Sequence, residues 1–267
     1  MPIFPETQFI DLDVNDGWLT VWFNQPERRN PLTDQVVKEL IQVCDALVDS
    51  REIRGLTIRG RGGFFCAGGD LKGFQAMAQG ESAAAIATSE MIGDLLARVN
   101  TLPQVTIALL EGAAMAGGLG LACCCDVTIG TADTRFAFTE TSIGISPAQI
   151  ARFVLQKCGY ATGRRLMLTA ARFKGEEAKA QGLLDQVVAN SADLEAAERG
   201  IRRDVLACAP GAVAATKALV TQLASIPDDQ KVAFAADNFT QCLRSDEGKE
   251  GVASFLEKRK PLWFKEI

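Results

Sequence analysis

The first half of the chain alternates nearly continuous apolar runs with segments of helical periodicity. Runs that are apolar at successive positions are typical of strands in a sheet that is covered on both faces. Four such runs predict strands, at Trp18–Phe23, Gly55–Arg59, Val105–Leu110 and Asp126–Ile129. The alternation predicts an α/β body.

Two helices are expected between these runs. Thr33 can cap a helix, and Asp34 lies favourably in its first turn. A second helix is expected from Ser82 to Val99 and ends at Asn100–Pro103. The apolar stripe of the first helix consists of Val36, Val37, Leu40, Val43, Cys44 and Leu47.

After about residue 145 the strand patterns nearly vanish. Seven segments have helical patterns: Ile150–Lys157, Gly163–Thr169, Gly175–Gln181, Leu194–Cys208, Ala212–Leu223, Gln230–Leu243 and Lys249–Lys258. No long linker separates them from the first half. We therefore expect a helical tail that packs on the body, on a neighbouring subunit, or on both.

Composition excludes several kinds of chemistry. The 267 residues include no histidine, which excludes a Ser-His-Asp triad, a Cys-His pair, an imidazole base and metal or haem binding through histidine. The net charge of −5 disfavours nucleic acid as a partner, because phosphate binding needs a surplus of Lys and Arg. No apolar run approaches the ~20 residues that span a bilayer, and residues 1–10 lack signal-peptide features. We expect a globular, cytoplasmic protein without a membrane partner.

The eight cysteines are expected to be reduced thiols that pack in the core. Three of them are consecutive, Cys123–Cys125, and lie in an apolar stretch. No C-x-x-C pair suggests zinc, so no metal site is predicted.

Two turns place paired glycines between an apolar strand and a helix, at residues 64–71 (FFCAGGDL) and 111–121 (EGAAMAGGLGL). Missing Cβ atoms let a ligand approach the backbone, and N–H groups at a helix start favour negative charge. Neither turn has the G-x-G-x-x-G or the P-loop pattern, so a nucleotide site is poorly supported. Either the glycines simply permit tight turns and close packing, or one N–H from each turn converges on one thioester oxygen, as an oxyanion hole.

These turns and two further segments resemble the crotonase (enoyl-CoA hydratase/isomerase) superfamily. The resemblance rests on residues 65–72 (FCAGGDLK), 115–126 (MAGGLGLACCCD), 138–144 (FTETSIG) and 250–261 (EGVASFLEKRKP). It implies an α/β, crotonase-type spiral of ββα turns over residues 1–200 and a C-terminal helical trimerisation region over 201–267. It also implies a homotrimer or a dimer of trimers, and an acyl-CoA substrate. No cofactor is predicted, because coenzyme A is part of the substrate.

The resemblance assigns roles to individual positions. Gly69 and Gly117 would donate the two N–H groups to the thioester oxygen, and Glu140 would be the catalytic acid/base. A structural carboxylate is the alternative for Glu140. The expected substrate- and CoA-binding set is Arg28, Ala67, Gly68, Asp70, Leu71, Gly118, Gln149, Phe255 and Lys258.

Some members of this set have specific expected contacts. The loop of Arg28 would follow the pantetheine and phosphates, and Ala67 and Leu71 would lie beside the adenine. Phe255 and Lys258 would contact CoA from the C-terminal helix, although a packing aromatic and a solvated charge are the alternatives.

One family position departs from the usual pattern. Typical hydratases have a second glutamate three residues beyond the oxyanion-loop glycine, and here that position is Gly120. Among relatives with one glutamate, feruloyl-CoA hydratase-like members add water, whereas 3-to-2 enoyl-CoA isomerases move a proton between C2 and C4. Gln149 could hydrogen-bond a water or a polar substrate branch, or it could be an ordinary surface glutamine.

The leading prediction is an enoyl-CoA hydratase, with the single-glutamate isomerase as the alternative. A third hypothesis is a non-catalytic, RNA-binding crotonase relative, which the negative net charge disfavours. Gly120 and the stretch 146–153 (SPAQIARF) most resemble the isohexenylglutaconyl-CoA hydratase branch, whose substrate has a C3 branch, an extra carboxylate and a long apolar tail. Small and flexible side chains could form such an acyl pocket, namely Ala76, Met77, Ala78, Ala83–Ala85 and Met91.

Overall fold

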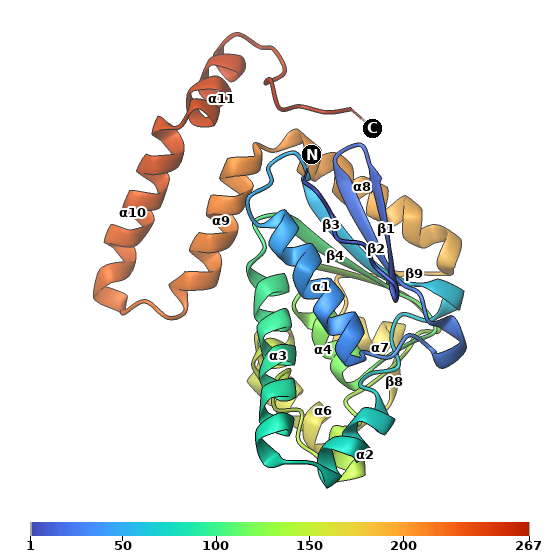
Figure 1. The fold of residues 1–267 in the computed structure, drawn as a ribbon. Helices are drawn as coiled ribbons and strands as arrows, with labels where there is room; N and C mark the ends of the chain where they lie inside the picture. Colours follow the sequence, from blue (N-terminus) through green and yellow to red (C-terminus); the bar gives the residue numbers. More distant parts are fainter. Residues whose placement is uncertain (1, 267) are drawn as a thin grey trace.

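A computed structural model describes residues 2–266 and contains two β-sheets (Figure 1). The six-stranded sheet has the order β1-β2-β3-β4-β6-β9, in which only the β1–β2 pair is antiparallel. Its strands are β1 (Ile10–Asn15), β2 (Trp18–Phe23), β3 (Gly55–Gly60), β4 (Val105–Leu110), β6 (Val127–Thr131) and β9 (Gln186–Val188).

The smaller sheet contains three short strands, β5 (Ala113–Met115), β7 (Arg135–Ala137) and β8 (Phe173–Lys174). Strand β5 follows β4 after a two-residue turn at Glu111–Gly112. The second glycine-rich segment therefore passes from one sheet to the other.

Helices cover both faces of the large sheet. Helix α1 (Asp34–Leu47) buries its predicted apolar stripe in the main core, and α3 (Ser82–Thr101) packs beside it. Helix α8 (Ser191–Ala207) covers the other face, where Leu194 packs in a second cluster with Trp18, Ile107, Leu109 and Ile129. The prediction of an α/β body with buried strands is confirmed.

The remaining helices complete the body and form the tail. They are α2 (Leu71–Gln79), α4 (Ala116–Cys123), α5 (Ala151–Cys158), α6 (Tyr160–Thr169), α7 (Gly175–Ala180), α9 (Pro210–Leu223), α10 (Asp228–Arg244) and α11 (Asp246–Leu256). Three short 3₁₀ segments are η1 (Pro26–Arg28), η2 (Arg61–Gly63) and η3 (Glu140–Ile143).

The four predicted strands are present, with ends that differ by at most two residues. Thr33 caps α1 as predicted, because its Oγ1 accepts a hydrogen bond of 3.3 Å from the N–H of Val36. The predicted strands do not include β1, an edge strand in which apolar and polar residues alternate, or four strands of only two or three residues. Strands that short give no readable periodicity.

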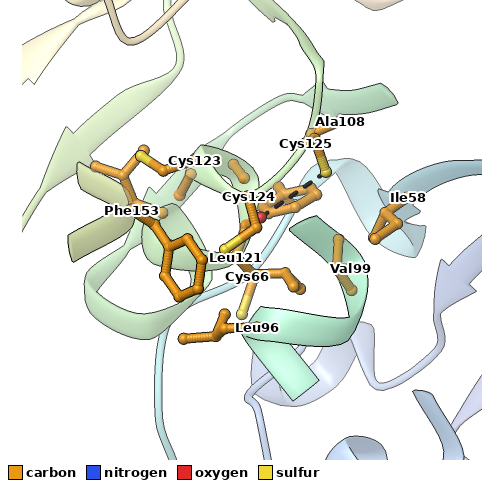
Figure 2. Packing of buried hydrophobic residues seen from close by; sticks show 14 of the residues in the cluster. Ile58, Cys66, Leu96, Val99, Ala108, Leu121, Cys123, Cys124, Cys125 and Phe153 are labelled. Atoms are coloured by element: carbon orange, nitrogen blue, oxygen red, sulfur yellow. Dashed lines mark hydrogen bonds between the residues drawn. The ribbon is translucent and has the colours of Figure 1, made fainter. Parts of the chain in front are cut away.

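The consecutive cysteines lie in the core, as expected. Figure 2 shows Cys123–Cys125 and Cys66 among apolar side chains that include Leu96 and Phe153. All eight cysteines are unpaired thiols, but the expectation of core packing is wrong for Cys208, which is exposed, and for Cys158 and Cys242, which are only partly buried. Burial raises the pKa of Cys66 and of Cys125 to about 12, so these sulfurs are neutral packing groups at physiological pH.

Helices α10 and α11 extend away from the body, and α9 connects them to it (Figure 1). Lys217 fixes α9 to the large sheet, because its Nζ lies 2.7 Å from Oδ2 of Asp126 and donates to the carbonyl of Gln104 at 3.0 Å. The C-terminal segment returns to the end of α8, where Nε1 of Trp263 donates to the carbonyl of Ala207 at 3.1 Å. The tail is thus anchored to the body at both ends, which agrees with the expectation that it packs on the body.

The predicted division after residue 200 falls inside α8, and the chain leaves the body at α9. The division into two regions remains a prediction. Among the described residues, no single helix is long and apolar enough to cross a bilayer. Helices α8 and α9 taken together have sufficient length and apolar composition, but they meet at an angle of 104°.

Candidate active site

The two glycine-rich turns lie side by side although the sequence separates them. The N–H of Cys66 donates to the carbonyl of Ala113 at 3.1 Å, and the N–H of Met115 donates back to the carbonyl of Cys66 at 3.0 Å. On the other side, the N–H of Leu32 donates to the carbonyl of Gly68 at 2.9 Å. Backbone pairing therefore holds three distant segments in one layer at this edge of the body.

Close packing between the turns requires the first glycine of the first pair. Gly68 has φ of 97°, and a Cβ there would lie 3.0 Å from both the carbonyl oxygen of Met115 and Cβ of Ala116. Ala116 itself has φ of 47°, which is uncommon and costly for a residue with a side chain. This turn in the backbone lies at the first residue of α4 and is followed directly by Gly117.

Gly69 and Gly117 line the same pocket. Within residues 2–266 the structure records no backbone acceptor outside regular helix bonding for either N–H group. Gly117 lies in the first turn of α4, where N–H groups lack helical partners and the helix dipole is positive. The predicted pair of donors is thus brought together around one cavity.

Glu140 lines this pocket from the first position of η3. Its side chain is buried, with a residue exposure of 7%, and Oε2 has no hydrogen-bond partner. Burial raises the pKa of this carboxyl group above its ordinary value, because the charged form loses its hydration. A carboxyl group in this state can both accept and return a proton.

The pocket has a volume of about 350 Å³, within the range of small-molecule sites. Its wall is mainly apolar, and the polar side chains in it are Glu140, Ser89, Ser146 and Gln149. No lysine or arginine of the described residues lines it. Of the small and flexible side chains suggested for an acyl pocket, Met77, Ala78 and Ala85 line it, whereas Ala76, Ala83, Ala84 and Met91 do not.

The position of the missing glutamate is filled. Gly120 is buried in α4, and a Cβ built on it would lie 2.1 Å from Cγ2 of Ile150. The next residue back, Gln149, lines the pocket and donates from Nε2 to Oγ of Ser89 at 2.9 Å. The stretch that departs from the two-glutamate pattern therefore supplies an aliphatic group where the Cβ of a glutamate would lie, and an amide next to it in the sequence.

Several residues expected to bind CoA gather next to Gly69. Arg28 and Asp70 form an ion pair with an N···O distance of 3.2 Å. Asp70 also caps α2, because Oδ1 accepts from the N–H of Lys72 at 3.3 Å. Ala67 and Leu71 are exposed beside this pair. These positions suit a surface contact with CoA, and their roles remain predictions.

Three expected contacts are not part of this arrangement. A Cβ on Gly118 would lie 2.7 Å from Sγ of Cys66, so Gly118 serves the packing of α4 and does not line the pocket. Phe255 is exposed on α11 and Lys258 follows that helix, and α11 lies at the opposite end of the molecule from α2 (Figure 1). Within one chain, Phe255 and Lys258 therefore cannot complete the site around Gly69.

Of the α3 wall of the pocket, the sequence predicted Ala85 but missed two residues. Ser89 and Ile92 line it, yet nothing in the local sequence marks them as site residues. The Gln149–Ser89 hydrogen bond spans 60 positions, so only the folded chain reveals it. Within residues 2–266, no three side chains of His, Cys, Asp or Glu are grouped so that they could hold a metal ion.

The enoyl-CoA hydratase/isomerase family profile matches residues 13–266. The chain belongs to this family. A bovine relative, enoyl-CoA hydratase domain-containing protein 2 (mitochondrial), is 30% identical over 252 residues, which cover 92% of this chain and 84% of the relative. The family membership makes the protein an enzyme of CoA-thioester metabolism and implies an acyl-CoA substrate.

Solved structures of related proteins confirm the fold. Pseudomonas aeruginosa AtuE is 40% identical and superimposes with a TM-score of 0.94, over 97% of this chain and 100% of that one. An enoyl-CoA hydratase/isomerase from Marinobacter aquaeolei is 34% identical with a TM-score of 0.91, over 96% of this chain and 98% of that one. The predicted α/β crotonase fold is therefore confirmed.

Proposed function

We propose that the enzyme is a hydratase that adds water across the double bond of a 2-enoyl-CoA thioester. The observation that carries this proposal is a single buried carboxyl group, Glu140, in a mainly apolar pocket that Gly69 and Gly117 also line. Two donors aimed at one oxygen stabilise the enolate that forms from a thioester. One carboxyl group suffices if it handles both proton transfers.

The steps follow from this arrangement. The thioester oxygen accepts hydrogen bonds from Gly69 and Gly117, which makes C3 electrophilic. The Glu140 carboxylate takes a proton from water, and the water oxygen bonds to C3 while the π electrons move to the thioester oxygen. The protonated Glu140 then delivers its proton to C2 and the carbonyl re-forms. The net change is addition of H to C2 and OH to C3.

An isomerase is the second candidate, because Gly120 leaves no second carboxylate. The same Glu140 could remove a proton from C2 of a 3-enoyl-CoA and deliver it to C4, with Gly69 and Gly117 holding the intermediate dienolate. No water enters the product of that reaction. The two reactions therefore differ in one atom that can be traced.

The acyl group proposed from the sequence resemblance is of the isohexenylglutaconyl type. The mainly apolar wall, with Met77, Ala78 and Ala85, supports a bulky apolar tail. The extra carboxylate would meet neutral donors only, such as Gln149, Ser89 and Ser146, because no lysine or arginine of the described residues lines the pocket. A panel of branched substrates with and without this carboxylate tests this point.

Incubation with a panel of enoyl-CoAs in oxygen-18 water separates the reactions. Label at C3 of the product supports hydration, whereas a shifted double bond without label overturns it in favour of isomerisation. If neither reaction occurs and Glu140→Gln leaves the cellular function unchanged, the result supports a non-catalytic role. The net charge of −5 disfavours RNA as the partner in that role.

We propose further that the cytoplasmic enzyme assembles through its tail as a trimer or a dimer of trimers. Exposed apolar side chains on α10 and α11 support self-association, among them Val232 at 80%, Phe239 at 66% and Phe255 at 83% exposure. Sedimentation of the purified protein tests this assembly, and a monomer at micromolar concentration would overturn it.

A further inference from the structure

Gln149 closes the acyl pocket against α3. Its Nε2 donates to Oγ of Ser89 at 2.9 Å, and both residues line the pocket. The amide therefore bridges the stretch that follows η3 to the helix on the other side of the cavity.

Gly93, one helical turn after Ser89 on α3, makes room for this amide. A Cβ on Gly93 would lie 2.4 Å from Oε1 and 3.0 Å from Cδ of Gln149. Residues four apart on a helix share a face, so Ser89 and Gly93 form the surface on which the amide rests. Gly93 itself does not line the pocket, whereas the Gln149 side chain that it contacts does.

The backbone that carries Gln149 is fixed. Ile150 is buried against Gly120, and the N–H of Ala151 donates to the carbonyl of Pro147 at 3.0 Å. A change at position 149 or 93 therefore moves the side chain of Gln149 rather than the loop. The size of that side chain then decides how far the cavity extends toward α3.

We infer that Gln149 determines the length of the acyl chain that the enzyme accepts, by acting as the end wall of the pocket. This inference rests on the proposed function, since it concerns the same pocket. Once the acyl chain of a substrate reaches Gln149, further methylenes do not increase the binding affinity, because they bury no additional apolar surface. Substrates with longer straight chains are therefore bound no better.

Calorimetric titration with saturated acyl-CoAs, from butanoyl to dodecanoyl, measures this length without turnover. For the unmodified enzyme, affinity should rise about fourfold per buried methylene and then level off at the chain that reaches Gln149. Gln149→Ala should move this plateau to longer chains. Gln149→Met, which keeps the volume and removes the amide, should leave the plateau within one methylene of its original place.

Gly93→Ala supplies a matched change on the other side of the contact. The added Cβ displaces the flexible Gln149 side chain into the cavity, so the plateau should move to shorter chains. The Gly93→Ala change should have no effect on the plateau in a Gln149→Ala background, because the displaced group is gone. Gly200→Ala is the control, since a Cβ there meets nothing within 4 Å.

A plateau that stays in place in Gln149→Ala, or an equal loss of affinity at every chain length, would overturn the inference. The result is separable from the proposed reaction. A shifted plateau without any hydration activity would refute only the hydratase, and hydration with an unshifted plateau would refute only the role of Gln149.

Discussion

Gly120 and Ile150 are packed so tightly that a Cβ on Gly120 would lie 2.1 Å from Cγ2 of Ile150. In family members with two glutamates, the sequence resemblance assigns a carboxylate to this position. Here the space is filled by an aliphatic side chain from the segment that also carries Gln149. The absence of a second glutamate at position 120 is therefore coupled to the packing of α4 against Ile150, the residue before α5.

This packing predicts that a second glutamate cannot simply be restored. Gly120→Glu should lower the free energy of unfolding by more than about 3 kcal/mol, because it combines overpacking with a buried charge. Urea denaturation measures the loss. The double variant Gly120→Glu/Ile150→Ala should recover part of it, and equal losses in the single and double variants would contradict the contact.

Glu140→Gln should lower kcat by at least about 10²-fold, because an amide cannot accept and return the proton. Binding of saturated acyl-CoA should stay within about twofold, since the amide keeps the shape of the side chain. Steady-state rates and calorimetric titration measure the two effects. The exposed Glu176→Gln is the matched control, and full activity of Glu140→Gln would remove Glu140 from the mechanism.

Burial of Glu140 also predicts a pH-dependent difference in stability. Its pKa is raised in the folded protein, so the folded state holds the proton more tightly than the unfolded state. The stabilisation relative to Glu140→Gln is fully present below the pKa of an exposed glutamate, about 4.3. It is lost as the pH rises through the raised pKa.

Urea denaturation of both proteins from about pH 4 to about pH 8 checks this difference. Glu140→Gln should gain stability relative to the unmodified protein as the pH increases, and then reach a constant difference. A difference that is independent of pH would mean that the carboxyl group is not desolvated.

Gly117→Ala should fold normally and react slowly. Its Cβ would lie 3.6 Å from Cδ1 of Leu32, an ordinary contact, with no other described neighbour within 4 Å, and Gly117 lines the pocket. We expect no loss in the free energy of unfolding and a loss of about 10² in kcat/KM, because the methyl group displaces the thioester oxygen from its donors. Gly200→Ala controls for the helix propensity, and an unchanged kcat/KM would exclude Gly117 from the oxyanion hole.

Five of the eight cysteines should resist thiol reagents in the native protein. Cys44, Cys66 and Cys123–Cys125 are buried, whereas Cys208 is exposed. Titration with Ellman's reagent should modify Cys208 at once and the buried five only after denaturation, because reaction requires an accessible thiolate. Rapid native labelling within Cys123–Cys125, located by peptide mapping, would contradict their place in the core.

Much of the body follows from local patterns. Continuous apolar runs indicate the buried strands, and Thr33 indicates the start of α1. Both signals can be found in the sequence because they depend only on neighbouring residues in the chain. Strand β1 alternates apolar and polar residues, which is a different strand signal from the continuous apolar runs of the buried strands. The two- or three-residue strands β5, β7, β8 and β9 escape detection, because tertiary pairing rather than local periodicity makes them strands.

The sequence by itself determined the family, the two glycine turns and the single glutamate, since motif residues at set spacings carry that information. Only the tertiary structure decided that Ile150 fills the place beside Gly120, that Ser89 and Gly93 support Gln149, and that Phe255 lies far from α2. It also assigned Gly118 to the packing around Cys66 rather than to the pocket. Contacts between residues 30 to 60 positions apart depend on how whole elements pack, and no local pattern encodes them.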